Sequence, residues 1–306
     1  MKRDLISLKN LTRQEILGII ELTESLKNGE LKECGQLNGQ SVALLFQKPS
    51  NRTRVSFEVG IWQLGGNCIY LGPKEIRLGV RESAKDVAKT LSRYLDAIVA
   101  RTYTHQDVVN LAENADIPII NGLSDMFHPC QALTDIFSIK EKFGRIDGIK
   151  IAYVGDGNNV CHSLMLACSK IGMDINIATP KGYEPKQEVV TLANESASLT
   201  GANITLTNNP EQAVEGVDVV YADVWVSMGQ EAEEEKRLTD FEGFQINSKL
   251  IEFANKNYIF MHCLPAHRGQ EVADDIIDGQ HSIVFDQAEN RLHMQKAILL
   301  FLLGRN

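Results

Sequence analysis

The sequence predicts an α/β protein of two domains, each a largely parallel sheet flanked by helices, with helices joining the two domains. The chain has 306 residues, of which 43% are hydrophobic, so it can bury more than one core. Short apolar segments alternate with helical patterns along the whole chain. Most of these segments are continuous and β-branched, which is typical of parallel strands covered by helices on both faces.

The expected strands follow one another at spacings that leave room for a helix between them. In chain order they are SVALLF, NCIYL, AIVART, IPIING, IKIAYVGD, DINIATP, NITLTN, VDVVYADVW, YIFMHCLP and SIVFD. The first segment, MKRDLISLKNLTRQEI, predicts a charged amphipathic helix, and AENRLHMQKAILLFLLG predicts a strongly apolar one.

A helix near the middle of the chain marks the expected domain boundary. The segment HPCQALTDIFSIKEKFG has Pro129 at its start and Gly144 at its end, and a new strand follows it. We therefore place the change of domain along this helix.

Composition and charge exclude several classes of protein. The formal charge of −9 argues against a nucleic-acid binder, which usually has a basic excess. The first residues lack the apolar core of a signal peptide, so we expect a cytoplasmic protein with reduced cysteines. None of the six cysteines has the spacing of a zinc site, and we expect no metal.

Two arginines stand at an unusual place directly after the first expected strand. Arg52 and Arg54 lie in the first turn of a helix, where the helix dipole normally favours acidic residues. Both could simply point into solvent. Alternatively, the N–H groups of this turn, the hydroxyls of Ser50 and Thr53, and a guanidinium group would form a cradle for phosphate.

Further polar residues follow the neighbouring strands, at the edge where ligands of open α/β sheets bind. Arg101 follows AIVA, and His128 and Gln131 follow IPIINGLSDMF, three residues apart and so on one helix face. A lone histidine is usually structural. A histidine, a glutamine and an arginine beside a phosphate cradle are the donors that polarise a carbonyl and stabilise an oxyanion.

The second half of the chain offers groups for a small zwitterion. Gly155 and Gly157 match the start of a dinucleotide fingerprint, but Val160 replaces its third glycine, which argues against a nicotinamide cofactor. The asparagines at 158–159 suit a carboxylate and an amine, and Asp223 with Ser227 could hold an ammonium group.

Cys263 places a thiol at the end of another expected strand, beside His262. A nucleophilic Cys–His pair is one interpretation. Adjacent strand residues point to opposite faces, however, so sequence adjacency alone does not create such a pair.

Four motifs in order, SNRTR, HPCQ, DVWVSMG and HCLPAHRG, resemble those of the aspartate/ornithine carbamoyltransferase family, and the last two are similar to its ornithine branch. The resemblance runs nearly from end to end. It implies one domain for carbamoyl phosphate, 1–130 plus 290–306, and one for ornithine, 131–289. It also implies a homotrimer, or a multiple of trimers, with sites shared between subunits. The family commonly has Thr where this chain has Asn51.

The resemblance also implies a role for each matching residue. Those for carbamoyl phosphate are Ser50, Asn51, Arg52, Thr53, Arg77, Arg101, His128, Gln131 and Arg291, with Arg77 reaching a neighbouring subunit's site. Those for ornithine are Asn159, Asp223, Ser227, Met228, Cys263 and Leu264. The catalytic set comprises Arg101, His128, Gln131, Cys263 and Arg291.

The implied reaction moves the carbamoyl group from carbamoyl phosphate to the side-chain amine of L-ornithine, giving L-citrulline and phosphate in arginine metabolism. No cofactor, nucleic acid or membrane partner is expected. Putrescine or another amine is the alternative acceptor, aspartate would call for added cations, and a non-enzymatic sensor would need a broken catalytic set. The sequence leaves open the biosynthetic or catabolic direction, the proton acceptor, assembly beyond a trimer and allostery.

Overall fold

The computed structural model describes residues 2–31, 35–76, 78, 82–226 and 231–305. It confirms the α/β prediction, because the chain forms two compact units, each around its own sheet. One unit comprises Met1–Phe137 and Glu289–Asn306, and the other comprises Ser138–Ala288. The division falls within two helices, α6 (Pro129–Phe143) and α13 (Val284–Leu303). The boundary expected from the sequence, after residue 130, lies earlier in α6.

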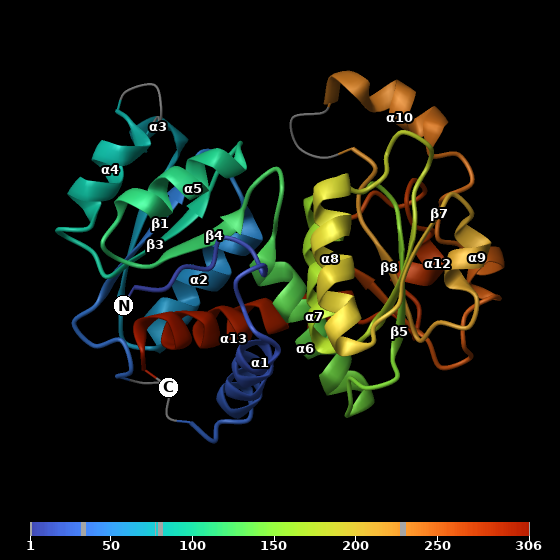
Figure 1. Ribbon diagram of the computed structural model, residues 1–306, viewed down its shortest axis with the longest axis horizontal. Helices are drawn as coiled ribbons and strands as arrows, with labels where there is room; N and C mark the ends of the chain where they lie inside the picture. Colours follow the sequence, from blue (N-terminus) through green and yellow to red (C-terminus); the bar gives the residue numbers. More distant parts are fainter. Residues whose placement is uncertain (1, 32–34, 77, 79–81, 227–230, 306) are drawn as a thin grey trace. The chain divides into compact units, whose positions relative to one another are not determined.

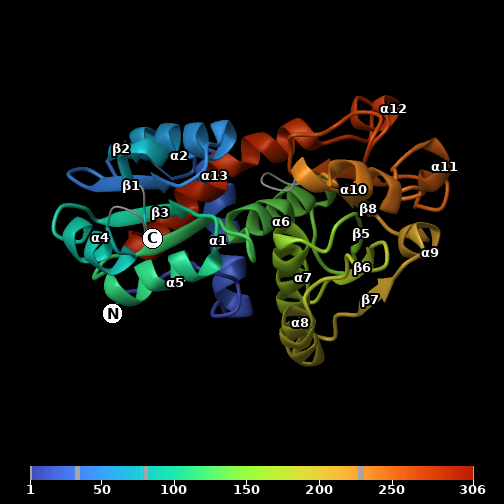
Figure 2. The same ribbon diagram turned by 90° about the horizontal axis from the view of Figure 1, so that it is seen from above.

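The first unit contains a four-stranded parallel sheet in the order β2-β1-β3-β4. The strands are β1 (Ser41–Phe46), β2 (Asn67–Leu71), β3 (Ala97–Arg101) and β4 (Ile119–Leu123). The helices that precede α6 are α1 (Arg13–Lys27), α2 (Asn51–Gln63), α3 (Pro73–Ile76), α4 (Ala84–Leu91) and α5 (His105–Asn114). In Figure 2, α2 and α13 cover one face of this sheet, and α4 and α5 cover the other.

Both faces of the central strands are buried, as continuous apolar segments predict. Ala43 and Ile98 pack into a core with Val87, Val108 and Leu111 of the helices on one face. The alternate residues of these strands are also inaccessible, as a sheet covered on both sides requires. The parallel pairing brings the carboxyl ends of all four strands to one edge of the sheet.

The second unit contains a five-stranded parallel sheet in the order β7-β6-β5-β8-β9. The strands are β5 (Lys150–Val154), β6 (Asp174–Ala178), β7 (Ile204–Thr207), β8 (Val219–Ala222) and β9 (Ile259–His262). The other elements are α7 (Asn159–Ile171), α8 (Gln187–Thr200), α9 (Pro210–Val214), η1 (Glu231–Glu233), α10 (Glu234–Asp240), α11 (Ser248–Ile251) and α12 (Asp274–Ile277). Figure 1 shows α7 and α8 on one face of the sheet, with α9 and α12 on the other.

Two expected elements were wrong. The amino-terminal segment is not helical before Arg13. Leu5 instead forms a bridge with Ile120 of β4. The helix begins only after Thr12, which forms a capping box with Glu15. The segment SIVFD is not a strand either. Ser282 forms one bridge with Phe260 of β9, and α13 then begins at Val284.

None of the helices within the described residues is long and apolar enough to cross a membrane.

Candidate active site

The phosphate cradle predicted after β1 is formed by the start of α2. Ser50 caps the helix in an extended conformation (φ −161°, ψ 117°), and its hydroxyl accepts a hydrogen bond from the Thr53 N–H at 3.3 Å. The first turn contains no acidic residue, so the positive end of the helix dipole is left for an external anion. Asn51 and Arg52 are exposed in this turn, whereas Thr53 is buried.

The two arginines of this turn differ in their contacts. Arg54 lies over the ring of Tyr70, 3.8 Å from its centroid, and its Nε donates to Glu58 Oε2 at 3.1 Å. The Glu58 carboxylate raises the pKa of Arg54 further. Arg54 is therefore held along the helix surface, and Arg52 is the candidate ligand for phosphate.

A buried group of donors surrounds Thr53 and comes from three elements far apart in the sequence. Arg291 of α13 donates through Nη1 to Gln131 Oε1 at 2.6 Å and through Nη2 to Thr53 Oγ1 at 3.4 Å. Gln131 in turn donates from Nε2 to Asp135 Oδ1 at 2.8 Å. The structure thus unites Thr53, Gln131 and Arg291, and it adds Asp135, which the sequence analysis missed.

Arg101 and His128 belong to the same unit and are each only 5% exposed. The register of the sheet pairs Arg101 with Phe46, so this arginine ends β3 level with the end of β1. His128 directly precedes α6, and its carbonyl accepts the N–H of Gln131. The backbones of both residues are therefore held at the ends of regular elements.

Burial lowers the pKa of His128 well below its usual range, and the positive charges of Arg291, Arg101, Lys48 and Arg52 lower it further. The imidazole is therefore neutral at physiological pH. A neutral imidazole can donate one hydrogen bond to a carbonyl oxygen without adding a further repulsive charge to the cluster.

Lys48 is a second residue that the sequence analysis missed. It is half-buried between β1 and the Ser50 cap, with its Nζ 5.5 Å from the centroid of the Tyr103 ring. Burial and the neighbouring Arg101 lower the pKa of the Lys48 ammonium to about 8, against an opposing effect of Asp125. The sequence did offer a signal for Lys48, because a lysine just before the SNRTR stretch adds a positive charge beside Arg52.

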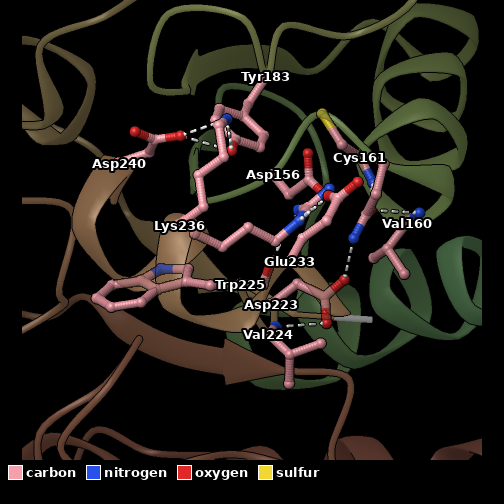
Figure 3. A network of polar contacts seen from close by, with 12 residues as sticks. Asp156, Val160, Cys161, Tyr183, Asp223, Val224, Trp225, Glu233, Lys236 and Asp240 are labelled. Atoms are coloured by element: carbon pink, nitrogen blue, oxygen red, sulfur yellow. Dashed lines mark hydrogen bonds and ion pairs between the residues drawn. The ribbon is translucent and has the colours of Figure 1, made fainter. Parts of the chain in front are cut away.

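In the second unit, Asp223 is the centre of a separate polar cluster (Figure 3). Asp223 follows β8 and is 3% exposed. Its Oδ1 accepts from the Val224 N–H at 2.8 Å and from the Cys263 thiol at 2.9 Å, and its Oδ2 accepts from Asn158 Nδ2 at 2.7 Å. The strand ends of β5, β8 and β9 therefore contribute to one carboxylate site.

The turn after β5 is shaped by packing. A Cβ atom at Gly157 would lie 2.3 Å from the Pro185 backbone nitrogen, so this close approach admits only glycine. Asn158 caps α7 by accepting the N–H groups of Val160 and Cys161 on its Oδ1. Asn159, the predicted ligand, is the first residue of α7 and is half-buried.

Cys263 and His262 lie closer than strand alternation predicts. One ligand atom from each of Asp223, His262 and Cys263 lies within 4.8 Å of the others, because β9 ends at His262 and alternation no longer applies. Three such groups could hold a metal ion. However, His262 Nε2 lies 3.3 Å from Glu271 Oε1, and its Nδ1 accepts the Leu264 N–H at 2.9 Å. Both ring nitrogens thus already have protein partners.

Leu264 has a left-handed φ of 56°, which turns the chain directly after Cys263, and its peptide bond to Pro265 is cis. The remaining predicted ligands, Arg77, Ser227 and Met228, lie outside the described residues.

The geometry defines a class of protein: an α/β protein of two units, with a cluster of cationic side chains at the strand ends of one unit and a buried carboxylate at those of the other. The sequence models of both domains of one family match the chain. The carbamoyl-phosphate-binding domain of the aspartate/ornithine carbamoyltransferases matches residues 3–141, and the Asp/Orn-binding domain matches residues 147–302. The chain belongs to the aspartate/ornithine carbamoyltransferase family.

Similar proteins support this membership over nearly the full length. The chain is 53% identical to an ornithine carbamoyltransferase of Thermococcus kodakarensis over 99% of this chain and 96% of that relative. It is 50% identical to the one of Bacillus subtilis, over 97% and 92% of the two chains. The solved structure of the Pyrococcus furiosus ornithine carbamoyltransferase superposes with a TM-score of 0.96 at 51% identity, covering 99% of this chain and 97% of that one.

The titration of Lys48 predicts how anion binding depends on pH. Lys48 is protonated below its pKa of about 8 and loses its charge above it, so affinity for a dianion falls as pH rises through that value. Calorimetric titration with inorganic phosphate should show the Kd rising about tenfold between about pH 7.5 and pH 9.5, the worth of one charged hydrogen bond. Lys48→Arg should abolish the rise. A Lys48→Gln protein with the wild-type profile would remove Lys48 from the site.

Proposed function

We propose that this protein transfers the carbamoyl group of carbamoyl phosphate to the side-chain amine of L-ornithine, producing L-citrulline and phosphate. The observation that carries the proposal is the junction of Thr53, Gln131 and Arg291 beside the cationic start of α2, in a chain of this family. Full-length similarity to ornithine carbamoyltransferases favours ornithine as the acceptor. A cytoplasmic location remains a prediction from the sequence.

In this proposal, the phosphate group sits at the start of α2. Ser50, Asn51, Arg52 and Thr53 supply hydroxyl, amide and guanidinium donors to it, and Arg291 adds its charge from α13. Arg101, His128 and Gln131 polarise the carbamoyl carbonyl. Because this cluster is preformed and largely buried, its donors need no reorganisation as negative charge develops.

Ornithine would bind in the second unit through opposite charges. Asp223 holds the α-ammonium group together with Ser227, and Asn159 and the Met228 backbone hold the α-carboxylate region. Cys263 and the Leu264 carbonyl contact the side-chain amine. The thiol of Cys263 donates to Asp223 Oδ1, so one hydrogen bond joins the two parts of this subsite.

The chemistry is an acyl transfer. The side-chain amine of ornithine is mostly protonated near neutrality, so the neutral form must be selected or generated before reaction. Its nitrogen attacks the carbamoyl carbon, the bond from that carbon to the phosphate oxygen breaks, and phosphate leaves with one proton. Carbamoyl phosphate is already an activated acyl donor, so the reaction as proposed needs no metal or organic cofactor.

The surface of α2 supports a homotrimer. Val55, Val59 and Trp62 recur at helical spacing and are 56%, 37% and 76% exposed in the isolated chain. This apolar stripe lies on the same helix as Arg52, and a second copy of the chain would cover it. An interface there would bring a neighbouring subunit beside the phosphate cradle, as shared sites and the predicted role of Arg77 require.

The choice of acceptor is tested by offering carbamoyl phosphate with ornithine, putrescine or aspartate and measuring the carbamoylated product. We expect ornithine to react with the highest kcat/KM, because Asp223 suits an ammonium group and repels the extra carboxylate of aspartate. Putrescine lacks an α-carboxylate and should react far more slowly. A preference for putrescine or aspartate would contradict the proposed acceptor.

Arg52→Ala should lower kcat about a hundredfold to a thousandfold, because loss of one donor to a charge that grows in the transition state costs about 3–4 kcal/mol. The matched control is Arg54→Ala, two positions along the same helix, where the lost partner is Glu58. Steady-state kinetics of both variants should show the large loss only at Arg52. Near-normal kcat and KM for carbamoyl phosphate in Arg52→Ala would contradict the assignment.

Shared sites predict complementation between two inactive variants. Subunits carrying Arg77→Ala and subunits carrying Arg52→Ala, once mixed and reassembled, should form some sites in which both arginines are intact. Activity should then recover to a fraction of the wild type, whereas each parent alone stays inactive. If subunit exchange is verified by mass and no activity returns, Arg77 does not serve a neighbour's site.

A further inference from the structure

The second unit contains a buried arginine that no step of the proposed reaction uses. Arg237 lies in α10 and is 6% exposed. Its Nη1 donates to Asp156 Oδ2 at 2.8 Å and to the Trp225 carbonyl at 2.9 Å, and its Nε donates to Glu233 Oε2 at 3.1 Å. These three partners lie together in the close view of the network (Figure 3).

Two of the contacts of Arg237 join segments that adjoin Asp223. Asp156 begins the turn after β5, and Asn158 of that turn donates to Asp223 Oδ2 at 2.7 Å. Trp225 follows Asp223 by two residues on the other side. One guanidinium group therefore ties together the turn that orients the Asp223 carboxylate and the segment that continues from it.

The ion pair of Arg237 and Asp156 also affects the charge around Asp223. Asp156 is 7% exposed, and its pKa is raised above the usual value, chiefly by burial. The hydrogen bond and charge of Arg237 oppose this rise, and the nearby Asp223 adds to it. Two buried carboxylates repel one another. With Arg237 bound to Asp156, that carboxylate is compensated, and Asp223 is left as the anion for a ligand.

We propose that Arg237 is a positioning residue for the amino-acid substrate, acting through Asp156 and the Trp225 carbonyl to hold Asp223 where it binds the ammonium group. The proposal rests on the proposed function in that Asp223 contacts the substrate. Arg237 itself does not touch the substrate, so its loss should weaken ornithine binding selectively and leave the carbamoyl-phosphate half unchanged.

Neighbouring Lys236 provides a matched control in the same helix. Its Nζ contacts Asp240 at 2.8 Å and the Tyr183 hydroxyl at 3.1 Å, and its side chain is 72% exposed. Lys236→Gln removes one positive charge from α10 without touching Asp156 or Trp225. It therefore separates the specific pairing of Arg237 from a general loss of charge.

The experiment compares Arg237→Gln, Asp156→Asn, the double variant and Lys236→Gln in the full-length enzyme. Arg237→Gln should raise the KM for ornithine at least tenfold and change the KM for carbamoyl phosphate less than twofold. Lys236→Gln should change both less than twofold. The double variant replaces an ion pair by two amides. The factor by which its KM for ornithine rises should therefore be well below the product of the factors for the two single variants.

Calorimetric binding of norvaline, which lacks the side-chain amine, at saturating carbamoyl phosphate should follow the same order and needs no turnover. Thermal unfolding of each variant separates lost positioning from lost folding. Equal rises in both KM values for Arg237→Gln, or independent effects of the two single changes, would overturn the proposal. A wild type that binds norvaline but does not carbamoylate ornithine would refute the proposed function while the norvaline series still decided the role of Arg237. A wild type that does not bind norvaline would overturn both.

Discussion

The concentration of positive charge at the carboxyl edge of the first sheet is the constraint on which the architecture of that unit depends. Arg101, Arg291 and Lys48 are gathered around a neutral His128 in a protein whose formal charge is −9. Burial lowers the pKa of both Lys48 and His128, and repulsion between these charges lowers it further. Only firmly held elements can maintain the cluster, and the register of β1 with β3 together with the hydrogen bonds of Arg291 provides that support.

The second unit also places polar residues after the carboxyl ends of its parallel strands, but the central residue there is acidic and not basic. The segments that follow β5, β8 and β9 converge on Asp223. A buried ion pair between Arg237 and Asp156 lies in the same polar network. The two parallel sheets thus differ in the charge placed after their strands, which is cationic in the first unit and acidic in the second.

The sequence was sufficient for the fold class and for the order of most strands, because apolar periodicity is local. It was insufficient where long-range contacts decide the outcome. Leu5 pairs with Ile120, which no periodicity reveals. Only Ser282 of the SIVFD segment forms a bridge with β9, through backbone hydrogen bonds of its neighbours His281 and Ile283 to Phe260. Asp135 and Arg237 were missed for the same reason, since only the tertiary structure brings their partners near. Lys48, in contrast, had a signal in its position beside the SNRTR stretch.

The low pKa of His128 also bears on which group accepts the amine proton in the proposed reaction. A base must bind a proton near the working pH, and the cations around His128 oppose this. The imidazole is therefore suited to donate a hydrogen bond to the carbamoyl oxygen and not to deprotonate the amine. His262 is equally unsuited, because Glu271 and the Leu264 N–H occupy its two nitrogens. The departing phosphate, which must gain a proton in any case, is then the natural acceptor, and the protein's task reduces to selecting a neutral amine and holding it against the carbonyl.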